Sequence, residues 1–431
     1  MNYPECIEYI FSSLPMFHRI GAAAYKADLS TTIRLCEHLG NPQDNFKAIH
    51  IAGTNGKGSV SSMLAAILQT AGYRTGLFTS PHLKDFRERI RINGQMIPEG
   101  EVAGFISRNK LFFDQLKPSF FEMTAGLAFE YFSKNHVEIA VIETGMGGRL
   151  DSTNLVKPVV SVITNIGLDH TQFLGDTLEK IAAEKAGIIK PEIPVMIGQT
   201  QPETEPVFRE FARRLNAPVT FADQDYHLEL RSESCLLTEG IRVDVYAGSQ
   251  LRYENLFCQL SGHYQIKNLV TVIKTTDILN SRRFIIEEAH IRKALERVSQ
   301  ITGFMGRWQI LSKNPLIICD TGHNEDGIRE VTNQLHTLKY HRLHFVFGMV
   351  NDKDITKVLE LLPKKAVYYF CKPDVPRGRD ASLLAHEAAG YGLQGNVYDS
   401  VTIALKAAKS AAAPDDLIMV GGSTFVVAEA I

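Results

Sequence analysis

The sequence predicts an α/β protein with a P-loop-type, mostly parallel sheet in its larger part and a smaller Rossmann-like α/β domain after it. Short apolar runs alternate with helical stretches along most of the 431 residues. A glycine-rich turn follows the first of these runs and opens directly into a helical pattern. The alternation restarts after residue 300, and at roughly 150 residues per domain a chain of this length is expected to form two or three domains.

The first part of the chain supplies most of the expected sheet. Residues 1–46 look helical and amphipathic, interrupted by turns such as Gly40-Asn41-Pro42. The apolar run at 47–52 (KAIHIA) predicts a strand, and small and apolar residues at helical spacing predict a helix over 58–71. Further buried strands are expected at residues 75–80, 138–143, 159–164 and 194–198, with a helix at 177–186 among those between them. Strands this apolar predict a parallel sheet covered by helices on both faces.

Residues 220–260 have a different pattern, since short alternating runs there favour antiparallel strands. Helices are expected at 264–279 and 287–298, and the glycine-bearing stretch 301–307 breaks the helical pattern. The chain is therefore expected to divide into domains at 1–299 and 300–431. In the second domain, strands are expected at residues 315–320, 343–348, 366–371 and 416–422.

Composition narrows the class of protein. Hydrophobic residues make up 45% and charged residues 22% of the chain, which is typical of a globular protein. Lys and Arg (46) nearly balance Asp and Glu (48), a net charge of −2 that argues against a nucleic-acid surface. The acidic N-terminus and the lack of an apolar run of ~20 residues argue against a secretory signal and a membrane span. The six cysteines are scattered without a CxxC pair, so reduced thiols and a cytoplasmic location are expected: Cys6, Cys36, Cys235, Cys258, Cys319 and Cys371.

The strongest motif is the glycine-rich loop GTNGKGS between the first strand and its helix. Its residues are Gly53, Thr54, Asn55, Gly56, Lys57, Gly58 and Ser59. Glycines let backbone N–H groups converge on a phosphate, and the helix N-terminus, Lys57 and the Ser59 hydroxyl suit phosphates and Mg²⁺. Only two residues separate the first glycine from the Gly-Lys pair, where the usual Walker spacing has four. A tight turn with an incidental lysine is the alternative, but the strand–loop–helix context favours nucleotide binding of a special subclass.

Other polar residues lie near the ends of predicted strands, where open α/β sheets place their ligands. They are Ser80 and His82; Glu143, with Arg149, Asp151 and Asn154 in the glycine-rich loop after it; and Asp169 with His170. Lys185 lies near the end of a predicted helix. Taken one at a time, most of these residues can be explained by a structural role in a turn, a helix cap or a solvated surface. Together with a phosphate loop, Ser59, Ser80 and Glu143 offer the oxygen ligands that Mg²⁺ prefers, and His170 suits a second metal site better.

Seven motifs in this order resemble the folylpolyglutamate synthase/dihydrofolate synthase family, part of the Mur-ligase superfamily of ATP-dependent amide ligases. They are GTNGKGS (53–59), TSPH (79–82), FRERI (86–90), ETGMGGRLDSTN (143–154), LDH (168–170), EKAGIIK (184–190) and DTGHNEDG (320–327). The resemblance covers almost the whole chain. It implies that 1–299 binds ATP and a folate and that 300–431 is a glutamate-ligase domain.

The resemblance also implies a role for individual residues. Residues 53–59 would hold the ATP phosphates, Ser80 and Glu143 one Mg²⁺, and Glu143, His170 and Lys185 a second. The family's lysine is commonly carbamylated, which gives it anionic oxygens for a cation. The remaining assignments are Asn268 to adenine, Arg307 to phosphate, Asp320 and His323 to ribose and phosphate, and His82, Arg89, Asp151 and Ser152 to the folate pocket. The residues assigned to catalysis are Lys57, Glu143, His170, Lys185 and His323.

Two motifs depart from the family pattern. Many relatives have Asp-Gly-Ala-His-Asn-Pro where this chain has residues 320–325 (DTGHNE), so the aspartate and histidine are retained. Relatives often have Arg-Leu-Glu where this chain has Arg307-Trp308-Gln309, so the glutamate is missing and the arginine remains.

The expected reaction adds L-glutamate to a folate through an acyl phosphate made with ATP. Both dihydropteroate and reduced folates are expected as substrates, with polyglutamylation slightly favoured, by a monomer without nucleic-acid or membrane partners. A Mur-type cell-wall ligase is the nearest alternative, but only 52 residues precede Gly53, fewer than its UDP-sugar domain needs. A P-loop kinase would leave Lys185 and the second domain without a role. A non-catalytic nucleotide-binding protein would follow if the metal residues did not converge.

Overall fold

The computed structural model describes residues 1–14, 28–231, 240–351 and 355–431. Cys235 and its surroundings lie outside the described residues. The chain forms two compact units, which are described separately. The first comprises Met1–Arg231, Arg242–Gln259 and Gln265–Phe304; the second comprises Leu260–Tyr264 and Met305–Ile431.

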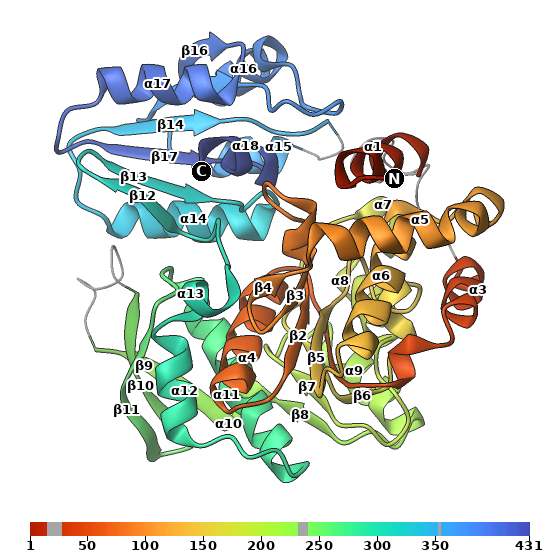
Figure 1. The fold of residues 1–431 in the computed structure, drawn as a ribbon. Helices are drawn as coiled ribbons and strands as arrows, with labels where there is room; N and C mark the ends of the chain where they lie inside the picture. The colour runs from red at the N-terminus through yellow and green to blue at the C-terminus, as the bar shows by residue number, and fades with distance from the viewer. Residues whose placement is uncertain (15–27, 232–239, 352–354) are drawn as a thin grey trace. The chain divides into compact units, whose positions relative to one another are not determined.

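An eight-stranded sheet forms the centre of the first unit, in the order β4-β3-β2-β5-β1-β6-β7-β8 (Figure 1). Its strands are β1 (Lys47–Ala52), β2 (Thr75–Phe78), β3 (Ile90–Ile92), β4 (Gln95–Met96), β5 (Ile139–Glu143), β6 (Pro158–Ile163), β7 (Val195–Ile197) and β8 (Val219–Phe221). The six strands from β2 to β8 in this order are parallel, which confirms the predicted sheet. The antiparallel β3–β4 hairpin at its edge was not predicted. Its Asn93-Gly94 turn, with φ of 46° and 77°, is the signal that could have revealed it.

Helices cover both faces of this sheet (Figure 1). The helices of the first unit are α1 (Tyr3–Ser13), α3 (Ser30–His38), α4 (Lys57–Thr70), α5 (Glu99–Leu116), α6 (Phe120–Lys134), α7 (Thr171–Leu174), α8 (Leu178–Ala186), α9 (Glu205–Arg214), α10 (Ala222–Asp225), α11 (Tyr264–Ser281), α12 (Glu288–Leu295) and α13 (Val298–Thr302). Ala48 and Ala52 of β1 join the apolar clusters under α5 and α6 and under α8 and α9. Helix α4 packs on β1, β2 and β5 from the other side, so β1 is buried on both faces.

Short 3₁₀ helices and a separate sheet complete the first unit. The 3₁₀ helices are η2 (Pro42–Asp44), η3 (Phe86–Arg89) and η4 (Ser152–Leu155). The separate sheet contains β9 (Tyr226–Leu230), β10 (Ile241–Ala247) and β11 (Gln250–Cys258), in the order β11-β10-β9. Strands β9 and β10 are antiparallel, as the sequence predicted for residues 220–260. The stretch 301–307 was predicted to break the helical pattern, but its first two residues still belong to a helix. Helix α13 extends to Thr302 and is capped by Gly303, where φ is 69°.

The second unit is built on a six-stranded sheet in the order β12-β13-β17-β14-β15-β16. Its strands are β12 (Gln309–Lys313), β13 (Leu316–Asp320), β14 (Leu343–Phe347), β15 (Val367–Cys371), β16 (Gln394–Tyr398) and β17 (Leu417–Gly421). Its helices are α14 (Glu325–Thr337), α15 (Thr356–Leu361), α16 (Ala381–Ala389), α17 (Val401–Ala411) and α18 (Thr424–Ala430). The four predicted strands are present, whereas the edge strands β12 and β16 were missed because neither contains a continuous apolar run; β12 is mostly half-buried and β16 is mostly exposed.

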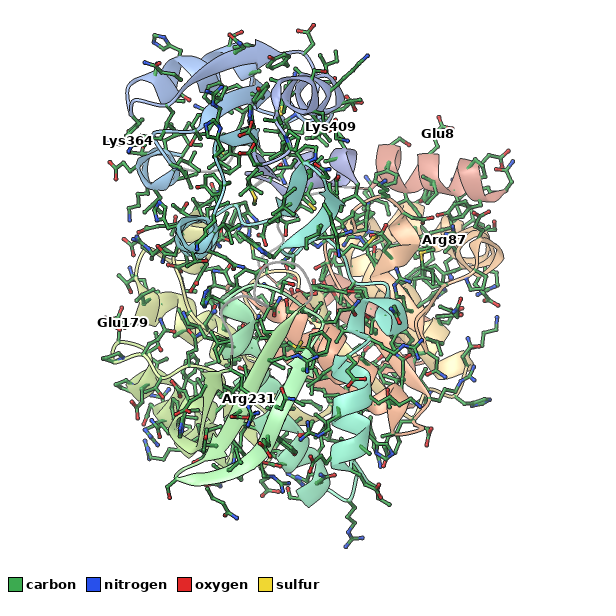
Figure 2. All side chains as sticks on the ribbon, turned by 90° about the vertical axis from the view of Figure 1, so that its left-hand side faces the viewer. Glu8, Arg87, Glu179, Arg231, Lys364 and Lys409 are labelled. Carbon is green, nitrogen blue, oxygen red and sulfur yellow. The ribbon has the colours of Figure 1, made fainter. Side chains whose placement is uncertain are left out.

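Charged side chains of both signs lie on the surface of each unit, as expected from the near balance of charge. The exposed examples in Figure 2 include Glu8, Glu179 and Arg231 in the first unit and Lys364 and Lys409 in the second. None of the helices in the described part of the chain has the length and apolarity needed to cross a membrane. The five cysteines among the described residues are buried and form no disulfide, as predicted: Cys6, Cys36, Cys258, Cys319 and Cys371.

Candidate active site

The glycine-rich loop connects the end of β1 to the start of α4, as the sequence predicts. Gly53 has φ of 147° and Gly56 has φ of 83°, values that disfavour residues with a Cβ. A Cβ at Gly53 would lie 1.9 Å from Thr164 Oγ1, and one at Gly56 would lie 2.3 Å from Asn268 Oδ1. Two glycines of the motif are therefore required by close packing, and Asn268 lies directly against the loop.

The segment that follows β6 holds this loop in place. Asn165 accepts the Thr54 N–H with its carbonyl and the Asn55 N–H with its Oδ1, each at 2.9 Å. The Thr164 hydroxyl donates to the Asn55 carbonyl at 2.6 Å. Sequence reasoning did not assign Thr164 and Asn165, although two polar residues at the end of an apolar strand beside a phosphate loop are a usable signal.

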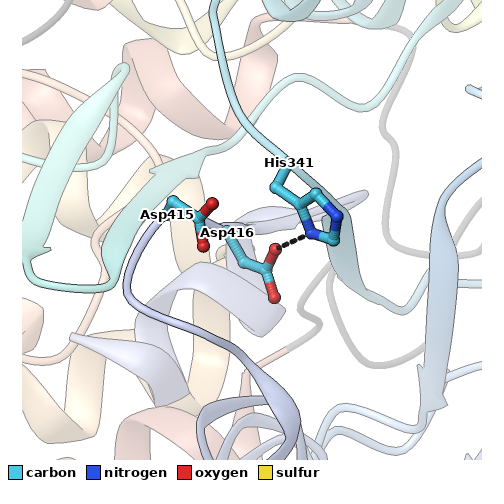
Figure 3. A group of neighbouring side chains, drawn as sticks. All are labelled: His341, Asp415 and Asp416. Carbon is cyan, nitrogen blue, oxygen red and sulfur yellow. Dashed lines mark hydrogen bonds and ion pairs between the residues drawn. The ribbon is translucent and has the colours of Figure 1, made fainter.

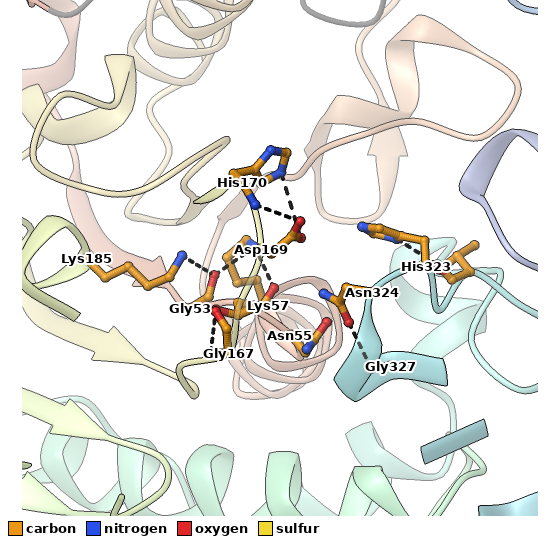
Figure 4. A network of polar contacts seen from close by, with 12 residues as sticks. Gly53, Asn55, Lys57, Gly167, Asp169, His170, Lys185, His323, Asn324 and Gly327 are labelled. Atoms are coloured by element: carbon orange, nitrogen blue, oxygen red, sulfur yellow. Dashed lines mark hydrogen bonds and ion pairs between the residues drawn. The ribbon is translucent and has the colours of Figure 1, made fainter. Parts of the chain in front are cut away.

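Two lysines point their amines at one backbone oxygen (Figure 4). Lys57 Nζ donates to the Gly53 carbonyl at 3.0 Å and to the Thr54 carbonyl at 3.2 Å. Lys185 Nζ, on α8, donates to the same Gly53 carbonyl at 2.9 Å. The pKa of Lys185 is lowered to about 7, chiefly by burial and also by the charge of Lys57, against the opposing effect of Asp169 and Asp151. A substantial fraction of Lys185 is therefore a neutral amine near pH 7.

The carboxylate of Glu143 lies beside the start of α4. Glu143 is only 3% exposed at the end of β5, and its Oε2 accepts the Ser80 N–H at 3.1 Å. The same oxygen lies 3.9 Å from the position that a Cβ on Gly58 would take. Ser59, next in α4, is buried and accepts a hydrogen bond from Gln265 Nε2 at 3.2 Å. The structure thus brings Ser80, Glu143 and the loop's last residues to one place.

His170 precedes α7, with a φ of 52°. Its N–H donates to Asp169 Oδ1 at 2.9 Å, and its Nε2 lies 3.9 Å from Asp169 Oδ2. Figure 4 shows His170 and Asp169 beside Lys57 and Lys185, around the Gly53 carbonyl. The residues assigned to the metals from the sequence therefore gather at the carboxyl edge of the sheet, near the phosphate loop.

The half-buried His82 and the buried Arg89 form a pair near the end of β2. Arg89 Nε donates to His82 Nδ1 at 2.7 Å, so Nδ1 is unprotonated and the ring carries its proton on Nε2. Burial lowers the pKa of His82 to about 3, with a further contribution from Arg89. Burial also lowers the pKa of Arg89 to about 10, and its guanidinium carbon lies 4.9 Å from the centre of the Phe120 ring. The pair places a cation and a hydrogen-bond donor beside an aromatic ring.

Asp151 and Ser152 lie at the start of η4. The Asp151 carboxylate accepts the N–H groups of Gly145 and Met146 at 2.9 Å each and that of Thr153 at 3.0 Å. The capping role that the sequence left open for Asp151 is thus present, and the carboxylate shapes the loop that follows Glu143. Ser152 is 8% exposed at the first position of η4.

The assigned residues of the second unit follow β13. Asp320 is only 3% exposed, and it accepts the Tyr264 hydroxyl at 2.6 Å, the Trp308 N–H at 2.8 Å and the Gly322 N–H at 2.7 Å. His323 Nδ1–H donates to the Thr321 carbonyl at 3.0 Å (Figure 4). Nδ1 therefore carries a proton, since a carbonyl can only accept. Within this unit, Asp320 therefore organises the loop that carries His323.

Two further contacts complete this loop. Asn324 caps α14 by accepting the Gly327 N–H at 2.8 Å (Figure 4). Arg307 Nη1 donates to the Gly306 carbonyl at 3.3 Å. Gln309, where relatives often have glutamate, accepts the Gly306 N–H at 2.8 Å, so this position still supplies an acceptor to its own loop.

Another polar cluster, which the sequence analysis did not identify, lies at the amino ends of β14 and β17 (Figure 3). Ligand atoms of His341, Asp415 and Asp416 lie within 4.8 Å of one another. Asp416 accepts hydrogen bonds from the Ala413 N–H at 2.8 Å and from His344 Nε2 at 3.2 Å. Burial would raise the pKa of Asp416, but these bonds and one from His341 outweigh it and hold the pKa at about 2. This network stabilises the edge of the sheet opposite to the one where Asp320 lies.

Comparisons with known protein families match both parts of the chain. The Mur ligase middle domain matches residues 51–276, and the Mur ligase, glutamate ligase domain matches residues 306–424. The fold and the two matches define a Mur ligase. The chain is 32% identical to the "Dihydrofolate synthase/folylpolyglutamate synthase" of Bacillus subtilis over 94% of each chain. It belongs to the folylpolyglutamate synthase/dihydrofolate synthase family, which confirms the resemblance found in the sequence.

Another relative has a longer chain. The "Probable bifunctional folylpolyglutamate synthase/dihydropteroate synthase" of Haloferax volcanii is 32% identical over the full length of this chain, which spans only about half, 50%, of that relative.

Solved structures of the family share the fold over the whole chain. "E.coli FolC in complex with DHPP and ADP" superposes with a TM-score of 0.85 at 28% identity, covering 100% of this chain and 97% of that one. A Yersinia pestis bifunctional folylpolyglutamate synthase/dihydrofolate synthase complexed with AMPPNP and Mn superposes with a TM-score of 0.84 at 27% identity, covering the same fractions. These similarities confirm the predicted fold class.

Proposed function

We propose that this protein uses ATP to join the carboxylate of a dihydropteroate or reduced folate to the amino group of L-glutamate. The observation that carries the proposal is the convergence of Lys57 and Lys185 on the Gly53 carbonyl within the phosphate loop of a member of this family. Residues 53–59 bind the ATP phosphates, with Asn268 beside the loop for the adenine side. The first unit is the ATP- and folate-binding domain, and the second is the glutamate-ligase domain.

Lys57 is suited to an anionic ligand. Its amine donates to two backbone carbonyls, and within the described residues it forms no ion pair with a carboxylate. The ammonium is therefore available for a phosphate oxygen, which is a stronger partner than a carbonyl. The N-terminus of α4, which begins at Lys57, adds its partial positive charge at the same place.

The residues near Glu143 fit divalent cations. The hydroxyls of Ser59 and Ser80 and the Glu143 carboxylate are hard oxygen donors, which match Mg²⁺. Lys185 would complete a second site with Glu143 and His170, because its lowered pKa leaves an amine able to react with CO₂ and form a carbamate with anionic oxygens. Bound at these residues, Mg²⁺ would supply positive charge for the phosphates and the developing oxyanions.

The reaction proceeds in two steps. The substrate carboxylate attacks the γ-phosphorus of ATP, the bond to the bridging oxygen breaks, and an acyl phosphate and ADP form. The neutral amino group of glutamate then attacks the acyl carbon and loses a proton, and the tetrahedral intermediate expels phosphate to leave the amide. Lys57 and Arg307 stabilise the negative charge on the transferred phosphate and on the oxygens of the tetrahedral intermediate, and His323 acts beside the phosphates.

The folate is proposed to bind near His82 and Arg89. The Nε2–H of His82 serves as a donor, since Arg89 fixes the ring tautomer, and the buried charge of Arg89 attracts the substrate carboxylate. Ser152, at the end of the loop that Asp151 caps, belongs to the same pocket. Holding the acid near Glu143 places it next to the phosphates that must be attacked.

The proposal is tested by ADP release from purified protein in the presence of Mg²⁺ and ATP. Release that requires both a pteroate-type acid and L-glutamate supports the ligase. Release with a hydroxyl acceptor would identify a kinase instead, and release with a UDP-linked peptide precursor would identify a cell-wall ligase. Dihydropteroate and a reduced folate monoglutamate, compared side by side, distinguish the two folate activities; both are expected, with the second slightly preferred.

We further propose that the protein works in the cytoplasm as a monomer, on small molecules alone. Five buried thiols without disulfides support a reducing compartment. The near balance of charged residues supports the absence of a nucleic-acid partner. Size-exclusion chromatography with light scattering tests the oligomeric state.

A further inference from the structure

A buried histidine at the centre of the sheet is not used by the proposed mechanism. His50 lies in the middle of β1, on the strand that leads into the phosphate loop, and it is fully buried. Its Nε2 lies 2.8 Å from Thr153 Oγ1, and its Nδ1 has no hydrogen-bond partner in the described part of the chain. A buried polar ring with one unsatisfied nitrogen is costly, so its single hydrogen bond requires an explanation.

The direction of this hydrogen bond follows from its neighbours. Thr153 Oγ1 lies 2.5 Å from Asp151 Oδ1. The Asp151 carboxylate also receives three backbone N–H groups, so it accepts and the Thr153 hydroxyl donates its only proton to it. Thr153 Oγ1 must then accept from His50 Nε2–H. The chain of donation runs from His50 through Thr153 to Asp151, among side chains that are at most 5% exposed.

The far end of this chain holds the loop that follows Glu143. Asp151 Oδ2 accepts the N–H groups of Gly145 and Met146 at 2.9 Å each, and these are the second and third residues after Glu143. This path of hydrogen bonds therefore connects β1, the strand that leads into the phosphate loop, to the backbone directly after Glu143.

The same loop packs tightly against the end of α8. The Arg149 N–H donates to the Glu184 carbonyl at 2.8 Å. A Cβ on Gly148 would lie 2.8 Å from the Lys185 carbonyl oxygen, and one on Gly187 would lie 2.3 Å from Arg149 Cβ. A shift of the loop would therefore displace the backbone that carries Lys185, because the contact leaves no space to absorb it.

We propose that His50 and Thr153 are positioning residues, which act through Asp151 to set the place of Lys185 relative to Glu143. Neither residue touches the reacting atoms. The inference rests on the proposed ligase function, since it assigns both groups to that reaction.

The test compares pairs of variants that keep or remove the donated proton. Thr153→Val removes the hydroxyl at nearly constant volume, and Thr153→Ser retains it. His50→Gln retains an N–H donor, and His50→Met does not. Thr275→Val is the matched control, because the fully buried Thr275 hydroxyl donates to the Thr271 carbonyl within α11 and has no contact with the loop or with Asp151 among the described residues.

Thr153→Val and His50→Met are expected to lower kcat about tenfold, as the loss of one buried hydrogen bond suggests. Thr153→Ser, His50→Gln and Thr275→Val are expected to stay within about twofold of the unchanged protein. The Kd for ADP, measured by calorimetry, is expected to be unchanged in all five variants. General loosening of the site would instead weaken ADP binding as kcat falls, and that result would overturn the inference, as would equal kcat values for Thr153→Val and Thr153→Ser.

A spectroscopic measurement tests the chain of donation without activity. ¹⁵N NMR of the His50 imidazole is expected to show a neutral ring protonated at Nε2; a ring protonated at Nδ1 would refute the direction of donation. If a Thr153 variant does not fold, the His50 pair and this spectrum decide. Loss of all ligase activity in the unchanged protein would refute the proposed function, whereas an active protein with indifferent variants would refute only the positioning role.

Discussion

The buried amine of Lys185 provides the most direct quantitative test of the site. Its pKa is lowered from 10.5 to about 7, chiefly by burial. In the unfolded chain the amine has its ordinary pKa, so between pH 7 and pH 10.5 the unfolded state binds more protons than the folded state. The contribution of Lys185 to the free energy of unfolding must therefore rise with pH across this window, and Lys185→Met must remove that contribution.

The size of the effect follows from the two pKa values. Between pH 7 and pH 9, the folded amine goes from about half neutral to almost fully neutral while the unfolded amine stays protonated, so Lys185 adds about 2 kcal/mol to the free energy of unfolding over these two units. A lysine in an ion pair has a raised pKa, and its contribution to stability falls as the pH rises; the contribution of Lys185 has the opposite sign.

The assay is urea unfolding followed by circular dichroism, at pH 7 and pH 9 in CO₂-free buffer. Lys180→Met is the control, since Lys180 lies on the same helix but is exposed and pairs with Asp176 at 2.8 Å. The protein and Lys180→Met should gain stability with pH relative to Lys185→Met by the same amount. If all three respond to pH alike, Lys185 has an ordinary pKa and the argument for a reactive amine is wrong.

Three other substitutions have expected outcomes. Gly53→Ala should weaken ADP binding more than tenfold, because its Cβ would meet Thr164 Oγ1, whereas Gly40→Ala, with a positive φ but nothing within 4 Å, should leave binding unchanged by calorimetry. Glu143→Gln should lower kcat at least ~100-fold in a coupled ADP assay while the melting temperature changes little, since the amide oxygen can still accept the Ser80 N–H; near-normal turnover would remove Glu143 from the metal sites. Asp416→Asn should be less stable than the protein at pH 6, and this difference should shrink as the pH falls from about 4 to about 2, because a lowered carboxyl pKa stabilises only above the folded value; a difference independent of pH in acid unfolding would contradict it.

Much of the fold follows from local pattern. β1 and α4 were predicted to within a residue because an apolar strand, a glycine loop and a helix each have their own signature. The hairpin of β3 and β4 and the edge strands β12 and β16 were missed, since edge strands bury little surface and tolerate polar residues. Tertiary contacts, and not local propensity, place them.

The site was predictable in its residue types but not in its contacts. The sequence identified Lys57 and Lys185 through two motifs more than a hundred positions apart, yet nothing in either motif shows that they share one carbonyl. The pKa of Lys185 depends on that burial and on that neighbour, and both arise only when α8 packs beside the loop. The hydrogen bonds from His50 through Thr153 to Asp151 could not be predicted from the sequence for the same reason.

The shared carbonyl of Gly53 has a consequence for the order of events in catalysis. An anion that draws the Lys57 ammonium toward itself, and adds its own negative charge, makes it easier for a proton to return to Lys185. CO₂ reacts only with the neutral amine, so protonation of Lys185 and carbamate formation exclude each other, and whatever favours the first disfavours the second. The protein should therefore acquire its carbamate more readily before the nucleotide arrives than after it.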